Sequence, residues 1–162
     1  MSELQRRVLT AVGLIPLVVL AVELGPTALV AGVFGVIVVA GAWEWAGFSP
    51  PASQGWRLGY AGITALALLA LEWSGAREDL LWALTGWGLL WWVVALYCVV
   101  RYQAMKVDAG KLADAQPPTR VEVALAGWSV LVPAWVALVG LHTRAEVGPH
   151  LVLGLLVMIW CA

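Results

Sequence analysis

The stretch from Leu80 to Val100, LLWALTGWGLLWWVVALYCVV, lies between Asp79 and Arg101 and holds no charged residue. A helix needs about 20 predominantly apolar residues to cross a bilayer, and this stretch has that length. Its apolar residues are continuous and do not alternate with polar ones, which indicates a helix rather than a strand of a membrane barrel. The stretch therefore predicts a transmembrane helix.

The composition of the whole chain agrees with this reading. Hydrophobic residues make up 62% of the 162 residues and charged residues 12%, with a mean hydropathy of +0.90. Soluble domains are about half apolar and about a quarter charged, so a soluble globular domain and a disordered segment are excluded. The net charge of -1 offers no basic surface to a nucleic acid. We expect an all-α, polytopic integral membrane protein that contacts membrane lipids and no nucleic acid.

Charged residues divide the chain into six apolar segments, at about 8–22, 27–45, 58–73, 80–100, 121–141 and 151–162. The second, fourth and fifth are long enough to cross a bilayer, whereas the first and third are short and need their flanking residues or a thinner bilayer. The sixth has too few residues for a complete crossing. We expect five full transmembrane helices and a truncated sixth, together forming one N-terminal transmembrane region over 1–162.

The distribution of lysine and arginine predicts the orientation in the membrane, because cytoplasmic segments carry the excess of these residues. With the N-terminus in the cytoplasm, only Arg77 and Arg144 fall on the outer side. The inner side then holds Arg6, Arg7, Arg57, Arg101, Lys106, Lys111 and Arg120. We therefore expect a multi-pass protein of the cell membrane with a cytoplasmic N-terminus. Although Arg6-Arg7 before an apolar run resembles a signal peptide, Glu23 stands where small residues flank a cleavage site, so we expect a retained helix.

Glu44, within the string AWEW at 42–45, is the best candidate for a functional ionisable residue inside an apolar segment. One reading places it at the headgroup level between Trp43 and Trp45, where water solvates the carboxylate. The other gives it a structural or substrate-binding role at a helix interface. Both readings stay open, and Glu44 is the one substrate-binding candidate that we assign.

Other polar residues favour structural roles. Glu122 begins an apolar segment, where a carboxylate stabilises a helix N-terminus, and we expect it to cap that helix. His142 and His150 could form a metal pair, but no third ligand stands at a useful spacing, so we expect a solvated loop. Cys98 and Cys161 lie in apolar runs and predict neither a disulfide nor a zinc site.

The polar stretch after Arg101 carries Asp108, Asp114, Lys106 and Lys111. These residues could meet a nucleotide–metal complex at the cytoplasmic face. We favour a simpler reading, in which the lysines set the topology and contact anionic headgroups. No catalytic residue and no metal ligand is assigned within the chain.

Prolines and glycines inside the apolar segments indicate helix packing. Pro16 and Pro133 each remove one backbone hydrogen bond, and we expect them to serve packing rather than a site. Gly32 and Gly35 permit a close approach between helices.

Four short strings resemble bacterial phosphatidate cytidylyltransferases, also called CDP-diglyceride synthases, in the order of that family. They are RVLTAVGLIP at 7–16, AWEW at 42–45, the helix with Gly127 and Pro133, and LVMIWCA at 156–162. The resemblance implies an enzyme of phospholipid biosynthesis that converts CTP and phosphatidate to CDP-diacylglycerol and pyrophosphate with Mg²⁺. A homodimer is a candidate assembly.

The resemblance also implies a missing part. The family's signature stretches, with its metal-binding and catalytic carboxylates, lie beyond the region that resembles this chain. We therefore expect an N-terminal fragment that is inactive alone and whose magnesium ligands lie elsewhere. The alternatives from other classes are a non-enzymatic membrane scaffold and a small transporter module.

Overall fold

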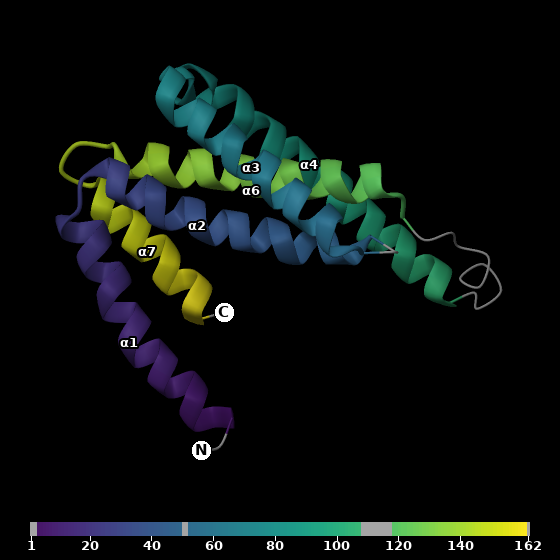
Figure 1. The fold of residues 1–162 in the computed structure, drawn as a ribbon, viewed down its shortest axis with the longest axis horizontal. Coiled ribbons are helices and arrows are strands. Elements are labelled where there is room, and N and C mark those ends of the chain that lie inside the picture. Colours follow the sequence, from purple (N-terminus) through teal and green to yellow (C-terminus); the bar gives the residue numbers. More distant parts are fainter. Residues whose placement is uncertain (1–2, 50–51, 108–117, 162) are drawn as a thin grey trace. The chain divides into compact units, whose positions relative to one another are not determined.

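A computed structural model describes residues 3–49, 52–107 and 118–161 of the chain, and within these ranges every regular element is a helix (Figure 1). The elements are α1 (Glu3–Leu24), α2 (Thr27–Trp45), η1 (Ala46–Phe48), α3 (Gln54–Ser74), α4 (Ala76–Val107), α6 (Arg120–His142) and α7 (Gly148–Cys161). The predicted all-α class is confirmed.

Helix ends differ from the ends of the apolar segments where good helix formers flank them. The helix α2 occupies the expected range 27–45. By contrast, α4 extends the expected 80–100 to Ala76–Val107, and α1 extends 8–22 to Glu3–Leu24. Arginine, glutamine, glutamate, lysine and alanine in these flanks have high helix propensity, so the helix continues beyond the apolar run.

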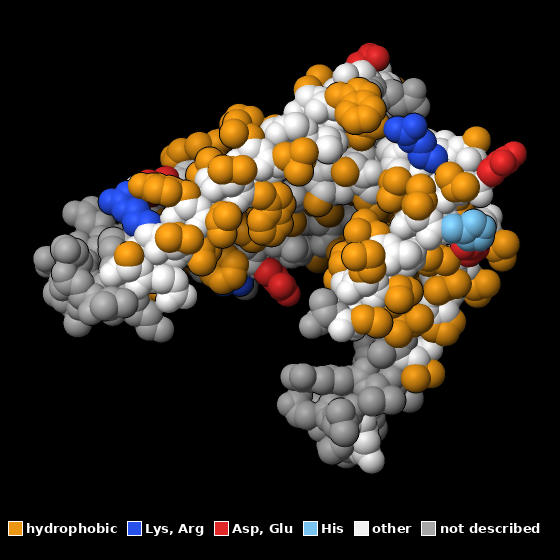
Figure 2. All heavy atoms as spheres, turned by 180° about the vertical axis from the view of Figure 1, so that it is seen from behind, with side chains coloured by type: hydrophobic (Ala, Val, Ile, Leu, Met, Phe, Trp, Pro, Cys, Tyr) orange, Lys and Arg blue, Asp and Glu red, His pale blue; other side chains and the backbone are white. Residues whose placement is uncertain are grey.

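Three helical stretches are long and apolar enough to cross a membrane, namely Thr27–Phe48, Asp79–Ala104 and Arg120–His142. They correspond to the three segments that the sequence singled out as long enough. Large hydrophobic side chains lie on the outside, such as Trp82 at 76% exposed, and Figure 2 shows them spread over the described helices with only scattered charges. A surface of this kind suits lipid contact rather than water. The chain is a multi-pass α-helical membrane protein.

A single residue joins α3 to α4. Gly75 has a φ of 68°, a left-handed conformation that glycine adopts without the steric cost of a side chain. At the other end of α3, the Ser53 side chain accepts a hydrogen bond from the Trp56 amide at 3.2 Å and caps the helix. These two signals set where α3 begins and ends.

The chain divides into two compact units, each with its own core. The first comprises Met1–Phe34 and Leu138–Ala162, and the second comprises Gly35–Ala137. One hydrophobic core cluster in the first unit consists of Val22, Val152 and Leu156. One cluster in the second unit consists of Ala42, Ala46 and Tyr60.

Candidate functional site

Aromatic side chains join α3 to α6 in the second unit. The Tyr60 hydroxyl donates to the Ala124 carbonyl at 2.9 Å. One turn further along, the Trp128 indole N–H donates to the Thr64 hydroxyl at 3.0 Å, and that hydroxyl donates to the Tyr60 carbonyl at 2.8 Å. The polar tips of these rings are therefore satisfied within apolar surroundings.

The N-terminal ends of α3 and α6 carry arginine. The Arg120 guanidinium lies over the Trp56 ring, with Cζ 5.7 Å from the ring centroid, which is within cation–π range. The contacting pairs are Trp56 with Arg120, Tyr60 with Ala124, and Thr64 with Trp128. Each pair lies four residues further along both helices than the pair before it, so α3 and α6 run parallel. Arg57 lies at the same end, with its guanidinium against Gly47 of η1.

Gly127 allows α6 to be approached closely by two aromatic rings. The Trp45 indole donates to the Val123 carbonyl at 2.9 Å, beside the Tyr60 contact. A Cβ on Gly127 would meet the Tyr60 hydroxyl and would lie 2.6 Å from Cδ1 of Trp45. Glycine is therefore required here for these hydrogen bonds to the α6 backbone to form.

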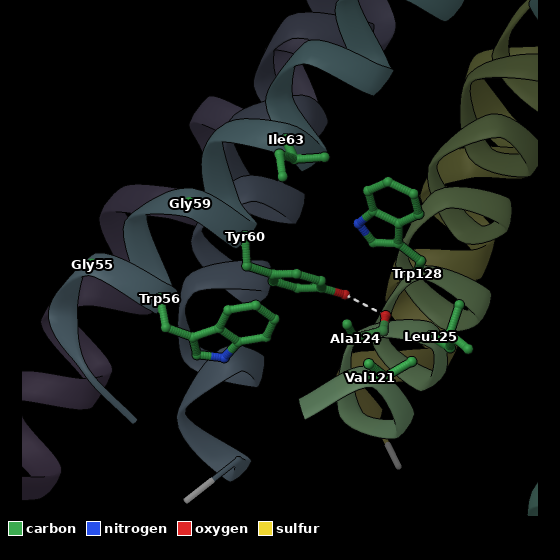
Figure 3. A pocket seen from close by; sticks show the side chains of 9 residues that line it. All are labelled: Gly55, Trp56, Gly59, Tyr60, Ile63, Val121, Ala124, Leu125 and Trp128. Atoms are coloured by element: carbon green, nitrogen blue, oxygen red, sulfur yellow. Dashed lines mark hydrogen bonds between the residues drawn. The ribbon is translucent and has the colours of Figure 1, made fainter. Parts of the chain in front are cut away.

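An apolar groove of about 320 Å³ lies between α3 and α6 (Figure 3). Its lining residues are Gly55, Trp56, Gly59, Tyr60, Ile63, Val121, Ala124, Leu125 and Trp128. None of them carries a carboxylate, an amine or an imidazole. At Gly55 and Gly59 an added Cβ would meet nothing within 4 Å, so the groove is open along this side of α3.

One polar atom of the groove lining is buried without a partner. Nε1 of Trp56 makes no hydrogen bond with the part of the chain that the structure describes. A buried donor without an acceptor costs about 1–3 kcal/mol. The donor belongs to the same tryptophan that Arg120 covers.

Glu44 does not line this groove. Its side chain is exposed and makes no hydrogen bond or ion pair with a described residue. Its neighbour Trp45 is the residue that contacts α6. The exposure places the carboxylate outside the helix contacts that the structure describes, and a role in substrate binding stays a prediction.

Glu122 caps α6, as the sequence predicted. Its carboxylate accepts from the Thr119 amide at 2.7 Å and from the Thr119 hydroxyl at 2.9 Å. In return, the Glu122 amide donates to the Thr119 hydroxyl at 3.3 Å. This reciprocal arrangement is a capping box.

The prediction of a solvated loop is wrong for His142, which is only 7% exposed. Its Nε2 lies 3.0 Å from the Val22 carbonyl, which can only accept, and its Nδ1 lies 3.1 Å from the Thr27 hydroxyl. The imidazole therefore joins the end of α1 and the start of α2 to the end of α6 within the first unit. His150 is exposed and pairs with Glu23 at 2.9 Å. Across the described ranges, no group of three or more His, Cys, Asp or Glu side chains could hold a metal.

Pro133 packs against α4, in agreement with the packing role expected for it. A Cβ on Gly88 would lie 3.1 Å from the Pro133 Cβ. Nearby, the Trp87 indole donates to the Ser129 hydroxyl at 3.2 Å. Cys98 is exposed and free. The hypothesis of a site around Asp108, Asp114 and Lys111 lies outside the described residues, and Lys106 belongs to α4.

The chain matches the sequence profile of the Cytidylyltransferase family over residues 5–162, and it belongs to that family. It is 29% identical over 165 residues to the phosphatidate cytidylyltransferase of Pseudomonas aeruginosa, an alignment that covers 98% of this chain and 54% of that protein. The chain thus spans about half the length of this curated relative. No solved structure matches it. The family resemblance predicted from the short strings is confirmed.

Proposed function

We propose that the chain is the N-terminal, membrane-embedded part of a phosphatidate cytidylyltransferase. The observation that carries this proposal is the similarity to the Pseudomonas aeruginosa enzyme along almost the entire chain. The apolar helices α2, α4 and α6 support it, because phosphatidate itself resides in the membrane. An enzyme in water would have to extract two acyl chains, at a cost of about 0.8 kcal/mol for each CH₂ group.

The proposed reaction is a nucleotidyl transfer. An oxygen of the phosphatidate phosphate attacks the α-phosphorus of CTP. The bond between that phosphorus and the oxygen bridging to the β-phosphate breaks, which yields CDP-diacylglycerol and pyrophosphate. Magnesium would neutralise charge on the triphosphate and on the leaving pyrophosphate.

Mg²⁺ bound with a nucleotide is held by one or two carboxylates together with phosphate oxygens. Among the residues that the structure describes, no three or more His, Cys, Asp or Glu side chains gather into a group that could hold a metal ion. We propose that the magnesium ligands and catalytic carboxylates belong to the part of the enzyme that corresponds to the rest of the relative, while this chain supplies membrane anchoring and a lipid-facing wall.

The proposed orientation places the N-terminus in the cytoplasm. The parallel arrangement of α3 and α6 brings Arg57 and Arg120 to the same end of the helix pair. The excess of lysine and arginine in cytoplasmic segments assigns that end to the cytoplasm. A homodimer stays a prediction.

Two preparations test the function. The chain alone, in detergent with CTP, Mg²⁺ and phosphatidate, is expected to form no CDP-diacylglycerol. A chimera in which the chain replaces the matched segment of the Pseudomonas aeruginosa enzyme is expected to form it. A chimera that reaches the membrane at the parental level, binds phosphatidate and CTP, and still makes no product would argue against the proposal. Turnover by the chain alone would place the chemistry within these residues.

A further inference from the structure

We propose that the groove between α3 and α6 binds one acyl chain of an anionic glycerophospholipid, whose phosphate lies beside Arg120. No carboxylate lines the groove, so the groove itself offers no metal ligand for the proposed nucleotidyl transfer. Binding requires neither CTP nor a metal, so the inference can fail or succeed independently of the proposed function.

The shape and chemistry of the groove suit a single hydrocarbon chain. Its volume of about 320 Å³ is at the lower end of ligand pockets, which span about 300–1,000 Å³, so a whole two-chain lipid does not fit. Carbon atoms form nearly all of its surface, and the Tyr60 hydroxyl is turned to the Ala124 carbonyl (Figure 3). Gly55 and Gly59 leave one side open for a chain to enter.

Burial of the acyl chain cannot by itself select a lipid, because lipid tails are as apolar as the helix surfaces around them. Selection requires the head group. The Arg120 guanidinium is held over Trp56 at the end of the groove where Arg57 also lies. A guanidinium has five N–H donors and binds phosphate in a bidentate manner, so it can serve a phosphate in addition to another partner.

The charges around Arg120 favour a net anionic head group. Phosphatidylcholine also has a phosphate, but its ammonium group is repelled by the Arg120 guanidinium. The nearest carboxylate along α6, that of Glu122, already accepts two hydrogen bonds from Thr119. Removal of one arginine near a membrane surface weakens binding of an anionic lipid about fivefold.

Native mass spectrometry of the purified full chain in detergent tests the inference. The probes are phosphatidylglycerol, phosphatidylcholine and glycerol 3-phosphate, and the measured quantity is the fraction of protein carrying one bound molecule. We expect retention of phosphatidylglycerol above phosphatidylcholine, and none of glycerol 3-phosphate. Gly59→Leu is expected to abolish the preference because its side chain occupies the groove. Gly62→Leu is the matched control: its Cβ also meets nothing within 4 Å, it lies on the same helix, and it does not line the groove.

The charge component has its own pair of variants. Arg120→Gln is expected to reduce phosphatidylglycerol retention about fivefold, whereas Arg144→Gln, in the exposed α6–α7 turn, is expected to leave it unchanged. If Gly59→Leu does not fold, Gly55→Leu replaces it. Equal retention of the two lipids, or equal loss in Gly59→Leu and Gly62→Leu, would overturn the inference. Retention of glycerol 3-phosphate would do so as well, because it would reduce the site to a phosphate contact without the groove.

Discussion

Replacing Gly127 with alanine places a methyl group where the Tyr60 hydroxyl and the Trp45 indole approach α6. Overpacking of this kind costs about 1–3 kcal/mol. The two hydrogen bonds to the Val123 and Ala124 carbonyls would lengthen or break, at about 0.6 kcal/mol each in a membrane protein. The higher helix propensity of alanine offsets this loss by about 1 kcal/mol. We expect a net loss of about 1–3 kcal/mol in the free energy of unfolding.

Unfolding in mixed micelles with increasing dodecyl sulfate, followed by circular dichroism, measures this free energy. Gly62→Ala is the control, because its methyl group meets open space and should raise stability by up to about 1 kcal/mol. Tyr60→Phe in the Gly127→Ala background removes the hydroxyl that the methyl group meets, and should restore part of the loss. If Gly127→Ala is as stable as Gly62→Ala, the close approach at Gly127 does not hold these helices together.

In a variant lacking Cys98 and Cys161, Gln103→Cys should react with a thiol reagent only from the cytoplasmic side, and Ala145→Cys only from outside. The opposite labelling pattern would contradict a cytoplasmic N-terminus. Glu44→Gln should leave membrane yield and the unfolding midpoint unchanged, because the carboxylate is exposed and has no described partner. A lowered midpoint would instead indicate a helix-interface role. His142→Leu should lose about 1 kcal/mol of stability with its two hydrogen bonds, whereas His150→Ala, at an exposed side chain, should lose less; equal losses would contradict the buried role of His142.

The helices were predictable because hydrophobic run length is a local property. The range 27–45 coincides with α2, and the segment ending near 73 and the next beginning near 80 became two helices separated by Gly75 alone. The charged residues at that turn indicated that the two helices are separate, but they did not predict that the connection is one residue long. A single glycine in the left-handed conformation is enough to end one helix and begin the next. The extension of α4 to Val107 follows from helix propensity, which apolar counting ignores.

The groove was not predictable from the same patterns. It requires α3 to pack parallel to α6, and the contacts of Tyr60 with Ala124 join residues far apart in the chain. Gly55 and Gly59 stand four residues apart and therefore share one face of α3. This spacing could have indicated that another helix approaches that face closely or that the face borders a groove. His142 was predicted to be solvated because it ends an apolar segment, yet its imidazole is buried against Val22 of α1 and Thr27 of α2. The capping role of Glu122 was predicted correctly because a capping box depends only on residues that are close in the sequence, here Thr119 and Glu122.

The hydrogen bonds from Trp45 and Tyr60 end on main-chain carbonyls of α6, and this has a consequence for how the protein can change over evolutionary time. A carbonyl is present whatever the residue, so substitutions at 123 and 124 that respect the available space keep both acceptors. The donors have no such freedom, because an indole and a phenol must be retained to reach across. The contact therefore concentrates selection on Trp45, Tyr60 and the glycine at 127, and lets the acceptor side of the helix drift in sequence.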